Sequence, residues 1–318
     1  MDEVAIIDFG TNTCNLIITD ISQESYNELF KHSIYVGLFL DANNLYEISN
    51  DAISKLKTTC LRFQSILDSY NIKKCYAFCT SAYRDSFNKE VLFNTITSNM
   101  RIIPKIISGD EECYFVYSSI DAQNNISSDE CFCIIELGGG SSEFVICDRN
   151  KTIVHCQCLP IGSQILTKRC QESCNFNIDN IGNSISQYLN DYLHDIIVKL
   201  KENHCSLFTL SSGIMLKVQQ INKKKFFINH DLNYMTLEDI VNVMDYIKTK
   251  VKGYSIKSFN IQMLITLNMF YFLMTNSNVD KILLSKCSFK RGIFNMIKSN
   301  YITYFVSDSN INVHPKLQ

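Results

Sequence analysis

The chain has 318 residues, of which 46% are hydrophobic and 19% are charged, so a sizeable buried core is expected, in two domains or one large one. Its 3 prolines and the absence of a long polar tract exclude a disordered protein. The formal net charge of −2 excludes a general attraction to nucleic acid or anionic lipid. A bound polyanion must therefore be held by local groups.

Strand-like and helix-like segments alternate along the chain, which predicts an α/β fold. Before residue 121 we expect strands at 3–9, 14–20, 26–37 and 75–79, a polar loop to residue 85, helices at 51–70 and 87–99, and an extended segment to Ile107 followed by a helix. The polar segment 121–130 is the expected domain boundary. Beyond it we expect strands at 131–137, 143–147, 151–158, 206–211 and 280–285, and helices at 177–203, 213–221, 236–250 and 258–276.

The 14 cysteines indicate a reduced, cytoplasmic protein. Some lie in apolar runs such as CFCIIEL (residues 131–137), where a cysteine behaves as a small buried hydrophobe. No pairs have zinc-ribbon spacing, and the acidic N-terminal strand candidate is unlike a signal peptide. The apolar run 259–274 is interrupted by polar residues, so we expect a buried helix and no transmembrane segment.

The N-terminal stretch AIIDFGTNTCNLIITD (residues 5–20) is echoed by IIELGGGSSEFVICD (residues 134–148). One constant offset, without a gap, aligns Asp8 with Glu136 and Gly10 with Gly138. Both copies read as a strand ending near an acid, a small polar turn, and a second strand. A repeat on this scale indicates a duplication.

A turn rich in Gly, Ser and Thr presents backbone N–H groups and hydroxyls without bulky side chains, which is typical of a phosphate-binding loop. The acid ahead of each turn repels phosphate but can hold Mg²⁺, which bridges to phosphate oxygens. We therefore expect Asp8 and Glu136 to be metal ligands. Two unrelated glycine turns are the alternative. The expected phosphate-binding residues of the turns are Gly10, Thr11, Asn12, Thr13, Gly138, Gly139, Gly140, Ser141 and Ser142.

At these residues the chain resembles the exopolyphosphatase/guanosine pentaphosphate phosphatase (Ppx/GppA) family, within the actin-like, sugar-kinase and heat-shock ATPase superfold. IDFGTNTCNLII (residues 7–18) and IIELGGGSSEFVI (residues 134–146) are similar to its two phosphate motifs. TSAYRDSFN (80–88) and IISGDEECYF (106–115) resemble two blocks between them. LSSGI (210–214) and LLSKCSFKRGIF (283–294) resemble later blocks more weakly.

The resemblance implies two ribonuclease-H-like domains with an active site in the interdomain cleft. The expected N-terminal domain comprises residues 1–124 plus 298–318, and the C-terminal domain residues 125–297. The resemblance further implies Glu112 as general base, Glu143 as a second acid, Arg84 as phosphate clamp, and Ser212 and Gly213 as further phosphate-binding residues.

Each role has an ordinary alternative. Glu112 follows two other acids at an expected helix N-terminus, where the helix dipole alone favours acids. Glu143 suits a solvated strand position, and a loop arginine such as Arg84 is commonly a surface charge. The run Lys223–Lys225 either guides a polyanion or is a solvated face.

The chain also departs from the family pattern at three places. Glu136 replaces an Asp, and YVGLFLDANNL (residues 35–45) lacks the usual basic residue. Phe289-Lys290-Arg291-Gly292 replaces Leu-Arg-Glu-Gly and loses its Glu.

The expected function is a phosphohydrolase that uses Mg²⁺ or Mn²⁺ and removes terminal phosphate from inorganic polyphosphate or the 5′-γ-phosphate from pppGpp. The alternative is a non-hydrolytic sensor of polyphosphate or a guanosine penta- or tetraphosphate on the same scaffold. A kinase of the same superfold is a third reading, although no adenosine-binding signature is evident. We expect no nucleic-acid or membrane partner, and a homodimer by family analogy alone.

Overall fold

The computed structural model describes residues 2–39, 46–120, 130–172, 178, 181–210, 212–226, 234–251, 259–285 and 287–302. The chain divides into two compact units, which are Met1–Ser119 with Phe289–Gln318 (unit 1) and Ile120–Ser288 (unit 2). Both domain boundaries expected from the sequence, 124/125 and 297/298, lie C-terminal to these limits. Nearly all of the polar segment 121–130 lies outside the described residues.

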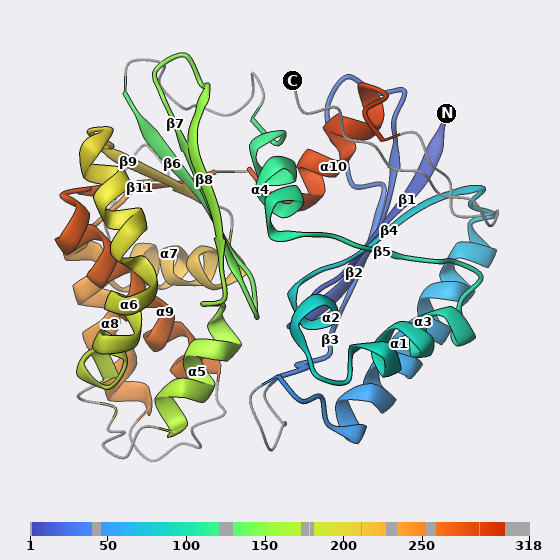
Figure 1. Ribbon diagram of the computed structural model, residues 1–318, viewed down its shortest axis with the longest axis horizontal. Coiled ribbons are helices and arrows are strands. Elements are labelled where there is room, and N and C mark those ends of the chain that lie inside the picture. The colour runs from blue at the N-terminus through green and yellow to red at the C-terminus, as the bar shows by residue number, and fades with distance from the viewer. Residues whose placement is uncertain are drawn as a thin grey trace. The chain divides into compact units, whose positions relative to one another are not determined.

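Unit 1 is built on a five-stranded mixed sheet in the order β3-β2-β1-β4-β5 (Figure 1). Strands β1, β2 and β3 pair antiparallel, whereas β4 and β5 run parallel to β1. The carboxyl ends of β1, β4 and β5 therefore meet at one edge. Its elements are β1 (Glu3–Phe9), β2 (Thr13–Asp20), β3 (Phe30–Tyr35), α1 (Asn50–Ser69), β4 (Lys74–Cys79), α2 (Ser81–Asp85), α3 (Lys89–Asn99), β5 (Lys105–Ile106), α4 (Gly109–Tyr117) and α10 (Phe289–Lys298).

Unit 2 repeats that strand order as β8-β7-β6-β9-β11 and adds β10 at the edge. The first three strands again pair antiparallel, and β9 and β11 run parallel to β6. Its elements are β6 (Phe132–Leu137), β7 (Ser142–Cys147), β8 (Ile153–Leu159), α5 (Ser163–Glu172), α6 (Ile181–Glu202), β9 (Leu207–Leu210), α7 (Gly213–Phe226), β10 (Tyr234–Thr236), α8 (Leu237–Val251), α9 (Phe259–Ser277) and β11 (Lys281–Leu284). The expected α/β class is confirmed.

The duplication extends to the register of the first hairpin in each unit. Asp8 lies opposite Asn15 in β1–β2, and Glu136 lies opposite Glu143 in β6–β7. The two pairs are related by the same offset as the two sequence motifs. The turns match as well, because a Cβ on Gly10 would lie 2.8 Å from the Thr13 carbonyl oxygen, and one on Gly138 would lie 3.0 Å from that of Ser141. A Cβ at Gly10 would therefore clash with the backbone of its turn, and a Cβ at Gly138 would be in very tight contact with the backbone of the second turn.

The sequence correctly predicts the N-terminal cap of α1 and the burial of α9. The Ser49 hydroxyl caps α1 by accepting from the Ala52 N–H at 3.2 Å, as expected. α9 is buried along most of its length, within the apolar core of unit 2, so the expectation of a buried helix at 259–274 is confirmed. Among the helices of the described residues, none has the length and apolar character needed to cross a membrane.

Four elements differ from the sequence expectation. The polar loop expected after residue 79 is the short helix α2, because Ser81, Ala82 and Tyr83 are buried and tertiary packing overrides a polar local sequence. α5 and β10 are additional elements. α10 is also additional and belongs to unit 1, although the sequence of its first residues indicates only a family motif.

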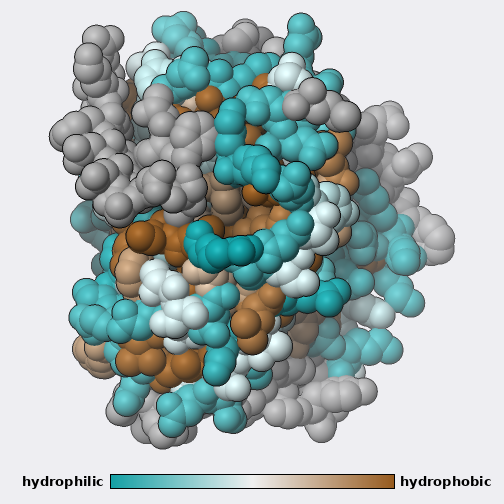
Figure 2. Space-filling view, turned by 90° about the vertical axis from the view of Figure 1, so that its right-hand side faces the viewer, coloured by the Kyte–Doolittle hydropathy of each residue, from teal (hydrophilic) through white to brown (hydrophobic). Residues whose placement is uncertain are grey.

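Figure 2 views the molecule from the right-hand side of Figure 1, and there hydrophilic side chains are interspersed with apolar ones. Some large apolar side chains of α1 and α3 are exposed, including Leu61 and Val91. Scattered exposure of this kind is usual for a folded protein and indicates no particular partner.

Candidate phosphate-binding and catalytic site

In unit 1, the expected site residues gather at the edge where β1, β4 and β5 end. The Thr80 N–H donates to the Phe9 carbonyl at 3.4 Å, and the Ile107 N–H donates to the Cys79 carbonyl at 3.1 Å, so the three strand ends are joined directly. The Gly10–Asn12 turn follows β1, α2 with Arg84 follows β4, and α4 with Glu112 follows β5. Ligand sites in parallel α/β sheets commonly form at this edge.

Glu112 is a buried carboxylate held by an arginine. It is 5% exposed and lies in the first turn of α4, which begins with a capping box between Ser108 and Glu111. Nη1 of Arg84 donates to Glu112 Oε2 at 2.7 Å and to the Ile107 carbonyl oxygen at 2.9 Å. Arg84 is therefore no isolated surface charge, and the ion pair fixes the orientation of both side chains.

Glu111 has a separate, structural role. Its carboxylate accepts from the Ser108 N–H at 2.9 Å and pairs with Lys105. Burial disfavours the charged form of Glu111, but the hydrogen bonds from Lys105 and Ser108 outweigh it and lower the pKa of this carboxyl. Of the acids at the start of α4, Glu111 is thus accounted for by helix capping.

Asp8, which is 8% exposed, has two contacts on one carboxylate oxygen. Its Oδ2 accepts from Asn15 Nδ2 at 3.1 Å and from Lys290 Nζ at 3.5 Å. Asn15 in turn accepts a hydrogen bond from the Ser33 hydroxyl, through Oδ1, at 2.8 Å. Lys290 thus lies at the candidate site, although the sequence marks it only as a departure from the family pattern. The signal available for it was its position in the FKRG block.

The first turn is anchored through its carbonyl groups. The Asn12 carbonyl oxygen accepts from the N–H groups of Val36 and Gly37 at 2.9 and 3.1 Å, and the Thr11 carbonyl oxygen accepts from Leu38 at 2.9 Å. Thr11 Oγ1 is buried and has no hydrogen-bond partner among the described residues. A buried hydroxyl of this kind calls for a ligand or a water, which is consistent with an anion-binding turn.

The second turn is anchored by the start of α5. The carbonyl oxygens of Gly138, Gly139 and Gly140 accept from Ser163, Gln164 and Gly162 at 2.9, 2.8 and 3.1 Å, respectively. Within the described part of the chain, no hydrogen bond engages the N–H groups of residues 139, 140 and 141. Consecutive unengaged N–H groups are a recognised anion-binding arrangement.

Gly162 makes this anchoring possible. A Cβ at this position would lie 2.3 Å from the carbonyl carbon and oxygen of Gly139, so only glycine allows α5 to approach the turn so closely. The sequence does not predict a role for Gly162, because nothing near it marks it as a contact of a turn that precedes it by two whole strands, β7 and β8.

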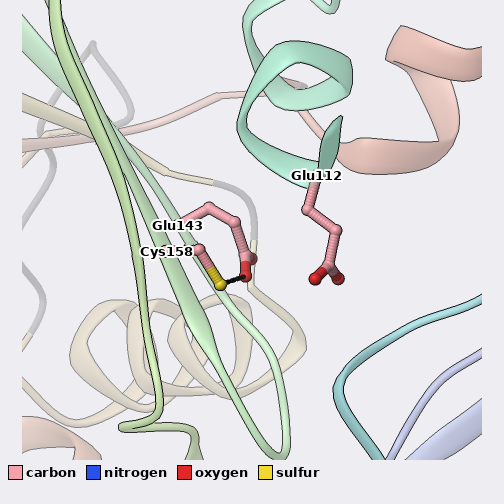
Figure 3. Close-up of side chains that lie close together, drawn as sticks. All are labelled: Glu112, Glu143 and Cys158. Carbon is pink, nitrogen blue, oxygen red and sulfur yellow. Dashed lines mark hydrogen bonds between the residues drawn. The ribbon is translucent and has the colours of Figure 1, made fainter. Parts of the chain in front are cut away.

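Three side chains of types that can bind a metal ion lie at neighbouring register positions on three adjacent strands of unit 2. Glu136 of β6 lies opposite Glu143 of β7, which lies opposite Cys158 of β8. Glu143 is 4% exposed, so it is not the solvated strand residue of the alternative reading. The Cys158 thiol donates to Glu143 Oε1 at 3.3 Å, the dashed line in Figure 3, which also draws Glu112 on α4.

Ser212 and Gly213 lie at the start of α7, after β9. Since β9 runs parallel to β6, with Leu210 beside Ile135, they lie at the same sheet edge as the second turn. Ser212 is buried, and its carbonyl oxygen accepts from the Leu216 N–H at 2.9 Å. Each unit thus collects its own expected residues. Unit 1 holds Asp8, Gly10–Thr13, Arg84 and Glu112, and unit 2 holds Glu136, Gly138–Ser142, Glu143, Ser212 and Gly213.

Two copies of one sheet order, each with a glycine turn and an acid at the carboxyl edge, define a duplicated α/β protein with the actin-like fold. The chain belongs to the Ppx/GppA phosphatase family, whose sequence model matches residues 17–263. Two of the solved structures that share its fold are the following. An exopolyphosphatase from Cytophaga hutchinsonii has a TM-score of 0.81 at 21% identity, with 94% of this chain and 98% of that chain covered. The Aquifex aeolicus PPX-GPPA enzyme has a TM-score of 0.70 at 16% identity, with 92% and 98% covered.

Among the curated proteins that are similar in sequence are the following two. A bifunctional 3-dehydroquinate synthase/phosphatase of Fusobacterium nucleatum is 31% identical over 149 residues, which is 45% of this chain and 22% of that protein. Exopolyphosphatase 2 of Mycobacterium tuberculosis is 26% identical over 183 residues, which is 54% of this chain and 56% of that protein. The chain thus spans about a fifth and about half of the length of these relatives.

Proposed function

We propose that this protein hydrolyses the terminal phosphoanhydride bond of inorganic polyphosphate. The oxygen of a water attacks the terminal phosphorus, the P–O–P bridge breaks, and orthophosphate and a chain shorter by one phosphate are released. The observation that carries the proposal is the duplicated glycine turn, with unengaged N–H groups at residues 139–141 and an unpartnered Thr11 hydroxyl among the described residues. Membership of a phosphatase family supports it.

The residues divide the work as phosphoryl transfer requires, which is mainly positioning and charge stabilisation. The two turns bind phosphate oxygens through N–H groups and hydroxyls. Glu112 accepts a proton from the attacking water, and Arg84, which holds Glu112, stabilises the charge on the transferred phosphate. Glu143 orients the water. Ser212 and Gly213 bind a further phosphate of the chain.

The donor sets fit Mg²⁺ or Mn²⁺, which prefer carboxylate oxygens. Glu136 and Glu143 lie directly opposite each other, and like charges in that arrangement repel unless a cation or a proton accompanies them. In unit 1, both contacts described for the Asp8 carboxylate are to Oδ2. We propose Asp8 and Glu136 as metal ligands. A bound divalent ion would neutralise phosphate charge and polarise the bond that breaks.

Polyphosphate is favoured over pppGpp because one curated relative and one similar structure are named as exopolyphosphatases. The pppGpp activity remains the second candidate, since the family name covers both. A sensor that binds without hydrolysis is the alternative on the same scaffold. A cytoplasmic location and a homodimer stay predictions.

Phosphate release from long-chain polyphosphate and, separately, from pppGpp tests the proposal, with Mg²⁺ present. Glu112→Gln keeps the size of the side chain but removes the base, so we expect phosphate release to fall by about 10²–10⁴-fold. Asp110→Asn is the matched control, because Asp110 is an exposed acid in the same turn of α4.

Each result decides one part of the proposal. No release from either substrate by the native protein would exclude the hydrolase, and binding without release would favour the sensor. Release of phosphate from pppGpp but not from polyphosphate would make pppGpp the substrate in place of polyphosphate. Equal rates for the native protein and Glu112→Gln would reject Glu112 as the base and leave the activity standing.

A further inference from the structure

In each unit, a side chain on the third strand of the sequence donates a hydrogen bond to a polar side chain on the second strand. These strands are β3 and β2 in unit 1, and β8 and β7 in unit 2. In unit 1, Ser33 of β3 lies opposite Asn15 of β2, and its hydroxyl donates to Asn15 Oδ1 at 2.8 Å. In unit 2, Cys158 of β8 lies opposite Glu143 of β7, and its thiol donates to Glu143 Oε1 at 3.3 Å. Asn15 and Glu143 are equivalent in the repeat, since the offset between them is the one that relates Asp8 to Glu136.

This correspondence distinguishes Cys158 from the other cysteines of the sheet. Cys133 and Cys147 are fully buried, as expected for small hydrophobic residues, and Cys133 belongs to the apolar core of unit 2. Cys158 is partly exposed, and it contacts a carboxylate that is itself 4% exposed. A thiol is a weak donor, but its contact with a charged acceptor in a buried place restricts rotation of that acceptor.

We propose that Cys158 is a positioning residue for Glu143. The S–H group holds Oε1 of Glu143, so that the carboxylate is kept in one orientation before substrate binds. This inference rests on the proposed function, because it presupposes that Glu143 orients the attacking water. A misplaced water lowers the rate of the chemical step and leaves substrate binding unchanged.

Three variants test the inference by steady-state kinetics on polyphosphate. Cys158→Ala removes the donor, and we expect kcat to fall by about tenfold with an unchanged KM. Cys158→Ser restores a donor of similar size, and we expect kcat to recover to within about twofold of the native value. Cys156→Ala is the control, because Cys156 lies on the same strand but opposite Val145, and its kcat should stay native.

Several kinetic results would overturn the inference. They are an unchanged kcat in Cys158→Ala, an equal loss in Cys158→Ser and Cys158→Ala, or a higher KM with native kcat. The last two would indicate a role in packing or in substrate binding. Circular dichroism of each variant establishes that it is folded.

An infrared measurement tests the contact without any activity. Hydrogen bonding lowers the S–H stretching frequency, and the difference spectrum between native protein and Cys158→Ala isolates the Cys158 band. We expect this band to shift to higher frequency in Glu143→Gln, because an amide oxygen accepts more weakly than a carboxylate. An unshifted band would overturn the inference even if polyphosphate hydrolysis holds. A shifted band in a protein that releases no phosphate would reject only the proposed function.

Discussion

Lys290 Nζ lies 3.5 Å from Asp8 Oδ2, although 282 residues separate the two in the sequence. The pair is formed within unit 1, because α10 packs beside α4 and β1. It places a positive charge at one of the two acids proposed to hold a metal ion. A divalent ion bound at Asp8 would therefore compete with the ammonium group for the same carboxylate.

Lys290→Gln should increase the affinity for Mg²⁺, because it removes this competing charge. We expect the Mg²⁺ concentration for half-maximal phosphate release to fall several-fold, by about 1 kcal/mol of binding free energy. Lys298→Gln on the same helix is the control, since Lys298 contacts the carbonyl oxygens of Gln23 and Glu24 instead. A higher or unchanged Mg²⁺ requirement in Lys290→Gln would contradict the competition.

Gly292→Ala should destabilise the protein by about 3 kcal/mol. A Cβ at Gly292 would lie 1.6 Å from the carbonyl oxygen of Phe115, so α10 and α4 would have to separate. This cost exceeds the gain of about 1 kcal/mol that alanine brings inside a helix. Urea unfolding measures the difference. Gly213→Ala is the control, because a Cβ there meets no atom within 4 Å and should not destabilise the protein.

Asp20 should make folding stability depend on pH in acid. Its carboxylate accepts from the Ser22 hydroxyl at 2.7 Å and from the N–H groups of Ser22 and Asp2 at 3.0 Å, and these bonds lower its pKa from 3.8 to about 2. The folded state thus favours the ionised form, and the stability this brings is complete above pH 3.8. It is lost as the pH falls through that value towards about 2.

Asp20→Asn provides the comparison for that pH dependence. Urea unfolding of both proteins across the acid range should show a steeper loss of stability in the native protein, since the variant has no proton to bind at this position. Parallel curves for the two proteins would mean that Asp20 does not contribute.

Thiol modification should separate the cysteines by burial. Burial raises the pKa of Cys14 and Cys79 far above the usual value and that of Cys60 to about 12, so these thiols are poor nucleophiles in the folded protein. Cys156 is exposed on β8. We expect an aromatic disulfide reagent to modify Cys156 first, and the three buried thiols only after unfolding. Peptide mapping by mass spectrometry would contradict this if Cys60 reacted early in native buffer.

Much of the candidate site could be predicted from the sequence, because the contacts that form it join residues that are close together in the chain. The ungapped repeat carries the hairpin register with it, so the equivalence of Asp8 and Glu136 also holds in the strand pairing. The capping box at Ser108 similarly lies within the segment whose sequence predicts a helix start.

The parts that could not be predicted depend on contacts between distant segments. Lys290 acquires its partner only because α10 returns to unit 1, and Gly162 matters only because α5 packs on a turn of another hairpin. Cys158 lies in β8, whose local sequence gives no sign of a partner for it. Its contact with Glu143 follows from the pairing of β7 with β8, which lies outside the repeated motif.

The close packing of Gly292 against Phe115 also sets an order of events during synthesis. Between the end of α4 at Tyr117 and the start of α10 at Phe289, the ribosome must add the whole of unit 2. At about 5–20 residues per second this takes roughly 10–30 s, during which the Phe115 surface lacks its cover. A nascent chain stalled before residue 289 should therefore expose an apolar surface that chaperones recognise. Completion of α10 at Lys298 and release from the ribosome should end that recognition.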